Sequence, residues 1–288
     1  MYKPIIFKAD KEALYSASQK KAGIYSAIYA ISILGLLAIC ILPYTMHWVS
    51  APKTEPQEAI VLITTSRGFG TGFLIDPTHI MTARHVVEKI PYEEEVSISF
   101  QRAAIPFETQ AMIAYYREAD QSDLKLSGAI KKAGNDFLNQ IVAVLATKYE
   151  SDYAILELEN EVTEITPLEF AKSSEFPEGP VQILGYGIGD WSAVSAQITS
   201  NKFHGNEKLY KIDASGANHG HSGSPILKVN EQGKPVAVVG IYVAGYEELY
   251  EELTGMRVEG GEQVGVKIDH VLKELDAQGY DFIKKNEK

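Results

Sequence analysis

A serine set among small residues is the feature of this sequence best suited to chemistry. Residues 220–225 read Gly-His-Ser-Gly-Ser-Pro. A serine hydroxyl is a useful nucleophile when a base removes its proton and nearby donors hold the oxyanion that forms. Glycines on both sides of Ser222 let the backbone N–H groups curl toward one point beside the hydroxyl. Taken alone, the hexapeptide also suits an ordinary loop.

Two further segments supply a base and its partner, in the order histidine, aspartate, serine. His85 lies in Thr-Ala-Arg-His-Val at 82–86, after a strand-like run at 70–75, and a fixed imidazole there can act as a general base. Asp152 opens the alternating strand Asp-Tyr-Ala-Ile-Leu at 152–156. It can orient the imidazole and stabilise its protonated form. Taken singly, the histidine suits a surface or core position and the aspartate suits a turn.

The three motifs, in this order, resemble those of the trypsin-like (chymotrypsin-fold) serine peptidases. The Ser-Gly-Ser-Pro ending is most similar to bacterial members of the glutamyl endopeptidase type. The resemblance covers about residues 58–278 and implies an all-β fold of two six-stranded antiparallel barrels with a C-terminal helix. It implies His85 as general base, Asp152 as its orienting partner and Ser222 as nucleophile. The backbone N–H groups of Gly220 and Ser222 would form the oxyanion hole.

The resemblance also implies a substrate-binding strand. Residues 239–245 read Val-Gly-Ile-Tyr-Val-Ala-Gly and follow Ser222 after one hairpin. In the family, such a strand lines the specificity pocket and pairs with the peptide. Substrate contacts are therefore expected at Gly216, Ala217, His219, Tyr242, Val243, Ala244 and Gly245. Glutamyl endopeptidases carry a histidine where this chain has Tyr242, so a preference for glutamate does not follow from the resemblance.

Turn spacing agrees with a mostly β domain. The 288 residues include 23 Gly and 12 Pro. Short alternating runs separated by turn residues recur at 59–64, 71–75, 95–100, 153–158, 181–186, 208–213, 225–229 and 236–243. This spacing is typical of sandwiches and barrels rather than of βαβ units. Near the C-terminus, the apolar residues Ile268, Val271, Leu272 and Leu275 share one face of a predicted helix.

Composition argues against several classes of partner and cofactor. The single cysteine, Cys40, lies in an apolar segment, so no disulfide can hold the catalytic domain. The net charge of −11 argues against nucleic acid as a partner and leaves a protein or peptide substrate. His219 and His221 form His-x-His, but no further cluster completes a metal site, and we expect no metal or cofactor. The glycine-rich stretch 68–72 is interpreted as a tight turn.

An apolar segment precedes the predicted protease domain. Residues 22–52 contain no Asp, Glu, Lys or Arg. As a helix, residues 23–43 would span about 31 Å, close to the hydrocarbon thickness of a bilayer. Lysines predominate before this segment, which places the N-terminus in the cytoplasm. A cleaved signal peptide is the alternative, but its apolar region is usually only about 7–15 residues long.

The predicted organisation therefore has one anchor and one catalytic domain. It consists of a cytoplasmic tail (1–22), a single-pass transmembrane signal anchor (23–43), a linker (44–57), a trypsin-like protease domain (58–278) and a C-terminal tail (279–288). The anchor would lie in the cell (inner) membrane, with the protease domain periplasmic or extracellular. The linker contains two prolines after residue 50 and is expected to be extended.

Two segments depart from the family pattern. The interval between His85 and Asp152 is longer than is usual, and the extra residues lie within 107–146. This stretch is interpreted as a surface excursion or as a lid near the cleft. The glutamate-rich residues 246–262 are interpreted as a solvated helical turn or as an acidic rim that favours basic groups on the substrate.

Two functional classes follow from these patterns. The first is a membrane-anchored serine endopeptidase that works through an acyl-enzyme intermediate. The second is a catalytically silent trypsin-fold binding module at the cell envelope. Family members of the second kind have usually lost a triad residue, whereas His85, Asp152 and Ser222 are all present. The sequence therefore favours an active enzyme.

Overall fold

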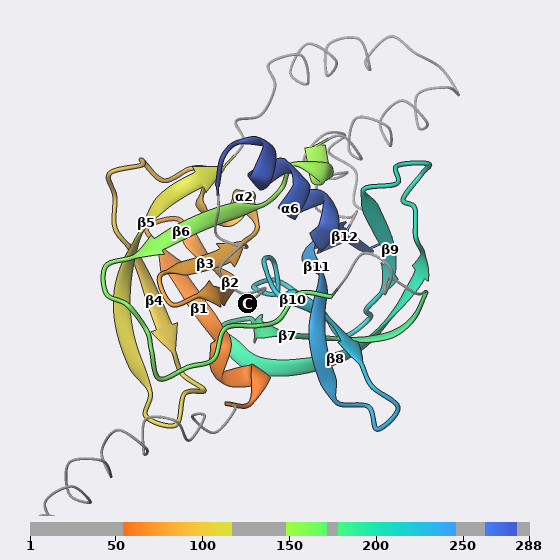
Figure 1. The fold of residues 1–288 in the computed structure, drawn as a ribbon, viewed down its shortest axis with the longest axis horizontal. Coiled ribbons are helices and arrows are strands. Elements are labelled where there is room, and N and C mark those ends of the chain that lie inside the picture. The colour runs from red at the N-terminus through yellow and green to blue at the C-terminus, as the bar shows by residue number, and fades with distance from the viewer. Residues whose placement is uncertain (1–53, 117–147, 172–177, 246–262, 281–288) are drawn as a thin grey trace, which may run out of the picture. The chain divides into compact units, whose positions relative to one another are not determined.

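The first of two closed barrels lies in the N-terminal half of the described chain. The computed structural model describes residues 54–116, 148–171, 178–245 and 263–280. The first barrel closes in the order β1-β2-β3-β6-β5-β4, with every pair antiparallel (Figure 1). Its strands are β1 (Ile60–Thr65), β2 (Gly68–Asp76), β3 (His79–Thr82), β4 (Val96–Phe100), β5 (Phe107–Tyr116) and β6 (Ala154–Leu158).

The second barrel follows along the chain and has the same number of strands. It closes in the order β10-β11-β12-β9-β8-β7, again antiparallel throughout. Its strands are β7 (Gly179–Gly187), β8 (Asp190–Ser200), β9 (Leu209–Asp213), β10 (Pro225–Val229), β11 (Pro235–Gly245) and β12 (Gln263–Lys267). The prediction of two six-stranded antiparallel barrels is therefore confirmed.

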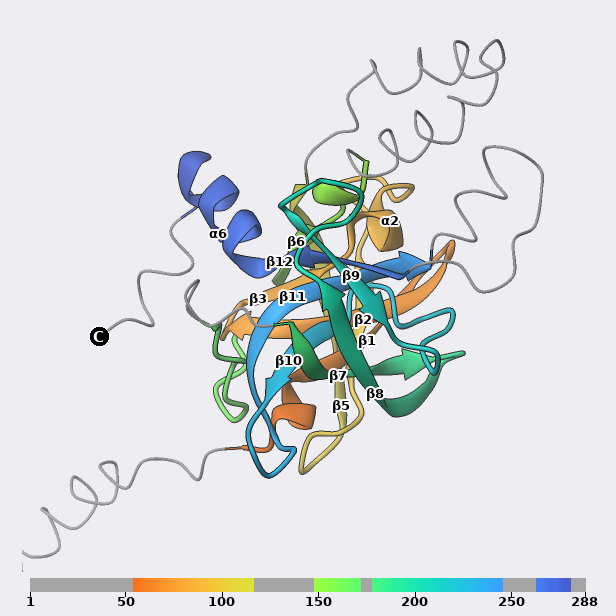
Figure 2. The same cartoon turned by 90° about the vertical axis from the view of Figure 1, so that its right-hand side faces the viewer.

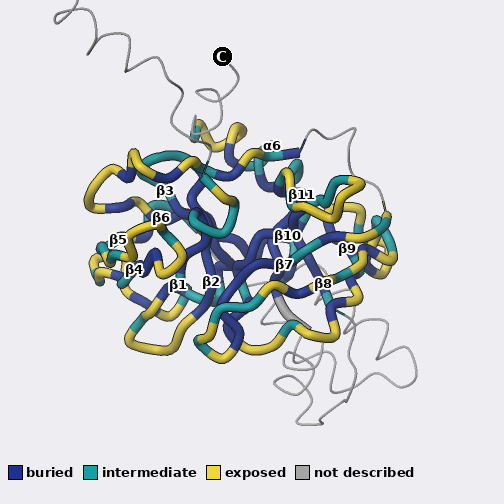
Figure 3. Tube along the Cα trace, turned by 90° about the horizontal axis from the view of Figure 1, so that it is seen from below, coloured by how far each residue is buried: buried dark blue, intermediate teal, exposed yellow. Residues whose placement is uncertain are grey.

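Apolar burial explains why the strands close on themselves. In β6, for example, Ile155 and Leu156 are fully buried whereas Glu157 is exposed. Closure removes the sheet edges and encloses the apolar side chains. The core of the first barrel continues into the second through Tyr186 and Leu227, and buried residues gather along the strands where the barrels meet (Figure 3). One hydrophobic cluster thus joins the two barrels, and the second barrel encloses a further cluster of its own.

A helix follows the last strand, as the sequence predicted. Helix α6 (Ile268–Ala277) begins directly after β12. Ile268, Val271 and Leu275 are fully buried, and the helix packs against β11 and β12 (Figures 1 and 2). The predicted apolar face is therefore confirmed.

One interpretation of the first barrel is wrong. Residues 68–72, interpreted as a tight turn, lie within β2 and pair in register with β1. Of the interval 107–146, within which the extra residues were predicted, residues 107–116 form the regular strand β5, which pairs with β4 and β6. The rest of that interval (117–146) and the acidic segment 246–262 lie outside the described residues.

The predicted N-terminal organisation falls mostly outside the described residues. The tail, the anchor at 23–43 and the first part of the linker at 44–57 are not described. Among the described residues, no helix has both the length and the apolar character needed to cross a membrane. In the described end of the linker, Glu55 is extended as predicted, whereas the last two linker residues, Pro56 and Gln57, belong to a 3-10 helix, η1 (Pro56–Ala59). The Oγ1 of Thr54 also accepts a hydrogen bond from the N–H of Thr166 at 2.9 Å.

Candidate active site

The strand pairing of the first barrel brings His85 to Asp152. Strand β3 pairs antiparallel with β6, and Thr82 lies opposite Ala154. The chain after Thr82 therefore runs beside the chain before Ala154. His85 lies in the short helix α2 (Arg84–Val87), which begins shortly after β3 ends. One pair of strands thus closes a sequence separation of 67 residues.

Both oxygens of the Asp152 carboxylate bind His85. Oδ1 accepts from the backbone N–H at 2.9 Å, and Oδ2 lies 2.8 Å from the ring Nδ1. A carboxylate can only accept, so Nδ1 carries the proton and Nε2 is the basic nitrogen of the neutral ring. The side chain of Asp152 is 6% exposed whereas that of His85 is 34% exposed. The buried carboxylate therefore orients a ring whose other edge faces outward.

The environment of Asp152 keeps its carboxyl ionised. Burial is the largest influence and raises its pKa, but the attraction and hydrogen bonds of His85 and the attraction of Arg84 together lower the pKa below its ordinary value. Arg84 is 1% exposed, and its Nε lies 3.2 Å from the carboxylate of Glu88. Asp152 is therefore negatively charged at neutral pH, as an orienting partner for an imidazole must be.

Ser222 lies where the two barrels meet. Its carbonyl oxygen accepts from the N–H of Thr71 in β2 at 2.9 Å. Gly223 has a φ of 87°, and a Cβ there would lie 2.1 Å from the Thr71 oxygen and 2.8 Å from the nitrogen of Ala83. Only glycine permits this approach. Because Ala83 directly precedes α2, Ser222 and His85 lie on chain segments that are in contact.

The hydroxyl of Ser222 donates to the carbonyl oxygen of Val243 at 3.0 Å. Val243 lies in β11, the strand predicted to bind the substrate. The acceptor in this structure is therefore a backbone carbonyl rather than the ring of His85. Rotation about the Cα–Cβ bond of Ser222 moves Oγ without moving the backbone. In ligand-free enzymes, catalytic hydrogen bonds often form fully only when a substrate is bound.

The backbone before Ser222 is turned so that it presents the N–H of Gly220. The carbonyl oxygen of His219 accepts from the N–H of Ile188 at 2.6 Å. In a planar trans peptide the N–H points opposite to the carbonyl, so the N–H of Gly220 points away from Ile188. Among the residues that the structure describes, no hydrogen bond engages the N–H of Gly220 or of Ser222. Two backbone donors are thus open on either side of His221.

The predicted substrate positions differ in exposure. Gly216 and His219 are exposed, and Ala217 is half-buried. Tyr242 is 3% exposed and packs in the core of the second barrel, and Val243 is fully buried. The side chains of Tyr242 and Val243 therefore belong to the core. The backbone of Tyr242 is bound to Gly223 and Ser224, so of these two residues Val243 is the one whose backbone could bind a substrate.

The end of β11 has an edge that β10 does not cover. Strand β10 pairs with β11 only as far as Ile241, whereas β12 continues along β11 to Gly245. Ala244 and Gly245 thus pair with β12 on one edge, Val243 lies at a register shift between the paired residues Tyr242 and Ala244, and all three predicted positions extend past β10 on the other edge. This is the geometry in which an extended peptide can add as a further strand.

Sequence analysis missed Thr71, which connects the two barrels at the site. Its side chain is fully buried. The hydroxyl accepts from the N–H of Tyr186 at 2.9 Å and donates to the carbonyl of Gly220 at 2.7 Å. The only sequence signal was a polar residue between two glycines in an otherwise apolar run. Thr71 therefore fixes the loop before Ser222 to both barrels.

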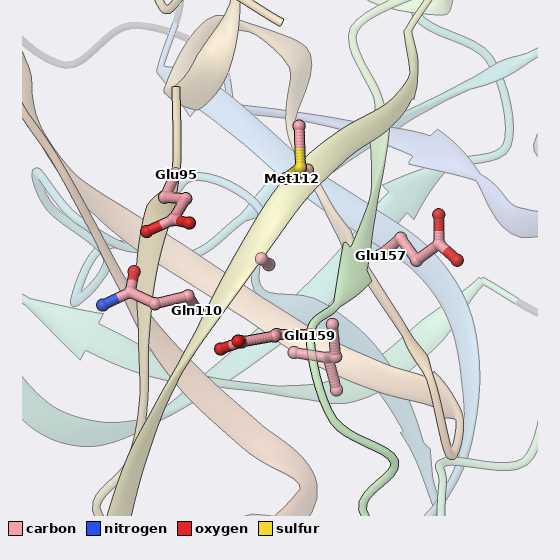
Figure 4. A pocket seen from close by; sticks show the side chains of 7 residues that line it. Glu95, Gln110, Met112, Glu157 and Glu159 are labelled. Atoms are coloured by element: carbon pink, nitrogen blue, oxygen red, sulfur yellow. The ribbon is translucent and has the colours of Figure 1, made fainter. Parts of the chain in front are cut away.

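A pocket of about 270 Å³ lies away from these residues, along strands β5 and β6 and beside Glu95, which directly precedes β4 (Figure 4). It is lined by Glu95, Gln110, Ala111, Met112, Glu157, Leu158 and Glu159. None of His85, Asp152 and Ser222 contributes to it. Among the described residues, no group of three or more His, Cys, Asp or Glu side chains is placed to hold a metal ion. The pocket is therefore separate from the site that these three residues form.

Comparison with known proteins gives one family match. The family model described as trypsin-like peptidase domain matches residues 70–241. This range includes His85, Asp152 and Ser222. No match was found among curated proteins.

Solved structures that are similar to this chain share little sequence with it. A serine-to-alanine mutant of Rv3671c from M. tuberculosis H37Rv, in an inactive form, has a TM-score of 0.50 and 19% identity, covering 78% of this chain and 89% of that chain. The inactive form of the Rv3671c protease has a TM-score of 0.49 and 20% identity, covering 78% and 90%. Deg5 has a TM-score of 0.49 and 18% identity, covering 77% and 88%.

Proposed function

Because the chain belongs to the family of trypsin-like peptidase domains and is thus a serine-type peptidase, we propose that it cleaves internal peptide bonds with Ser222, His85 and Asp152. The observation that carries the proposal is that both carboxylate oxygens of Asp152 hydrogen-bond to His85. The contact between Gly223 and Ala83 supports it, because it brings the serine loop to the start of α2.

The proposed reaction proceeds through an acyl-enzyme. Oγ of Ser222 attacks the peptide carbonyl carbon while Nε2 of His85 takes its proton. The protonated ring then gives this proton to the leaving amine as the C–N bond breaks. A water molecule then attacks the carbonyl carbon of the ester while Nε2 of His85 takes a proton from it. The ring returns this proton to Oγ of Ser222 as the ester bond breaks, which releases the carboxylic acid product. Asp152 remains ionised throughout and stabilises the imidazolium.

The hydrogen bond from the Ser222 hydroxyl to the carbonyl of Val243 must break before this reaction can begin. The same carbonyl lies on the uncovered edge of β11, where an incoming peptide would find an acceptor for a backbone N–H. A substrate strand that donates to this oxygen would compete with the serine hydroxyl. We infer that peptide binding releases Oγ toward His85.

The open N–H groups of Gly220 and Ser222 support an oxyanion hole. The carbonyl oxygen of the substrate gains negative charge in the tetrahedral intermediate, and two fixed N–H donors stabilise it without reorganisation. Removing one such donor typically costs about 10²–10³-fold in rate. The likeness to glutamyl endopeptidases rests on residues 222–225 and stays a prediction.

A test of this function uses a fluorophosphonate probe, which labels activated serines. The full-length chain should be labelled, and Ser222→Ala should lose the label. Ser224→Ala is the matched control: Ser224 is fully buried, and its hydroxyl has no hydrogen-bond partner among the described residues. This variant should label like the wild type. A wild type that is never labelled would favour the silent binding module instead.

We further propose that residues 23–43 anchor the protein in the cell membrane, with the N-terminus cytoplasmic and the protease domain outside. The support is the uncharged run at 22–52 and the lysines before it. After carbonate extraction, the full-length chain should stay in the membrane pellet, and a variant that lacks residues 1–43 should be released. Release of the full-length chain would contradict the anchor.

A further inference from the structure

His221, the neighbour of the proposed nucleophile, is fully buried and has no part in the proposed acyl-enzyme reaction. It lies between Gly220 and Ser222, whose N–H groups form the proposed oxyanion hole. Its Nε2 lies 2.7 Å from Oγ of Ser192, which belongs to β8. A strand of the second barrel therefore reaches the residue between the two donors.

The other ring nitrogen faces Asn218, at the start of the same loop. Nδ1 of His221 lies 3.1 Å from the backbone N of Asn218, 3.2 Å from its backbone oxygen and 3.0 Å from its Oδ1. Nδ1 can donate to either Asn218 oxygen or accept from the backbone N–H, and Nε2 takes the complementary role toward the Ser192 hydroxyl, which can accept or donate. The ring thus links β8 to Asn218.

The end of β7 closes a third side of the ring. A Cβ at Gly187 would lie 2.3 Å from Cε1 of His221 and 2.2 Å from Oδ1 of Asn218. Any side chain at this position would displace both groups. The imidazole therefore sits directly against bare backbone, in a place fixed by packing as well as by hydrogen bonds.

A second link joins the same hairpin to the loop. The N–H of Ile188, in the turn between β7 and β8, donates to the carbonyl of His219. Ile188 has a φ of 55°, which a β-branched residue rarely adopts. Such conformations persist only where the surroundings hold them. The hairpin is therefore tied to the loop on both sides of Gly220, through His219 and through His221.

We propose that His221 is a positioning residue for the oxyanion loop, which we define as residues 218–222. By bonding to Ser192 and Asn218, it holds this loop against the β7–β8 hairpin and keeps the N–H groups of Gly220 and Ser222 directed at one point. It acts through the backbone and does not touch the substrate. The inference rests on the proposed function and adds to it.

The ring performs this role in its neutral form. Burial lowers the pKa of His221, and the hydrogen bond with the Asn218 backbone opposes the shift only in part. Its nearest partners from β7, β8 and the loop are Gly187, Ser192 and Asn218, none of which has a titratable side chain. In a neutral ring one nitrogen donates and the other accepts, and Asn218 and Ser192 can each partner either role. The neutral form of His221 can therefore make both hydrogen bonds.

Ser192→Ala tests the proposal, because it removes the bond to Nε2 from outside the loop. In the full-length chain with the fluorophosphonate probe, the labelling rate at saturation should fall roughly 10-fold, a fraction of the ~10²–10³-fold lost with a whole oxyanion donor. The half-saturating probe concentration should not change. Ser192→Thr keeps a hydroxyl and should restore most of the rate. Ser195→Ala, exposed on the same strand, should label like the wild type.

The outcomes separate this inference from the function it rests on. If Ser222→Ala loses the label while Ser192→Ala keeps the wild-type rate, the positioning role is wrong and the catalytic role of Ser222 stands. A rate for Ser192→Thr as low as that for Ser192→Ala would also overturn the positioning role. If Ser222→Ala is still labelled like the wild type, both proposals fail.

Discussion

At the scale of single residues, the site combines a buried residue that is charged, Asp152, with a buried residue that is neutral, His221. Asp152 stays ionised although it is buried, because His85 and Arg84 compensate for the loss of water. His221 is buried without a counter-charge and is therefore held neutral. Asp152 must stay deprotonated to be charged, and His221 must stay deprotonated to be neutral. The two groups gain a proton in different pH ranges, so their effects on stability can be measured separately.

The buried histidines predict how stability varies with pH. Burial lowers the pKa of both His221 and His270 below the ordinary 6.5, so the unfolded chain binds more protons than the folded one at mildly acidic pH. The free energy of unfolding should therefore fall as the pH drops from 7.5 through 6.5 to 5. The stability contributed by Asp152 is lost only below its ordinary 3.8, outside this window.

Urea unfolding of His221→Asn measures how much of this pH-dependent loss of stability is due to His221. The variant should lose less stability between pH 7.5 and pH 5 than the wild type does, because it no longer carries a group that gains a proton on unfolding. His270→Asn should flatten the profile in the same way. An unchanged pH profile in His221→Asn would contradict a ring held neutral by burial.

At the scale of elements, the sequence predicted best where apolar residues alternate in short runs. Strand β6 and the apolar face of α6 were correctly predicted for this reason. Strand β5 was missed because Met112, on the face opposite its buried Ala111 and Ile113, is apolar and 46% exposed. The alternation therefore disappears from the sequence, and the strand merges into the longer interval before Asp152.

The β7–β8 hairpin could not have been linked to the oxyanion loop from sequence. The contact of Ser192 with His221 depends on the register that pairs it with Gly185, and on the approach of the loop to Gly187. Neither leaves a local pattern. The role of Thr71 is hidden in the same way, since it depends on a second barrel that begins more than one hundred residues later. Sequence motifs predicted the groups proposed to react, whereas the residues that hold them in place depend on tertiary contacts.

At the scale of the molecule, the proposed catalytic groups come from both barrels. His85 and Asp152 belong to the first barrel, and Ser222 lies in the second where Thr71 binds its carbonyl. Because one hydrophobic cluster spans both barrels, the relative position of base and nucleophile is set by packing rather than by a local turn. The central claim is that these side chains act as one proton-transfer chain across this boundary.

Asp152→Asn tests that claim most directly, with labelling of Ser222 by fluorophosphonate as the measurement. An amide would present an N–H to Nδ1 of His85, force the other tautomer and leave Nε2 unable to take the serine proton. The labelling rate at neutral pH should fall by about 10³–10⁴-fold. Asp213→Asn, an exposed site in β9, should keep the wild-type rate. Equal rates in Asp152→Asn and the wild type would contradict the account.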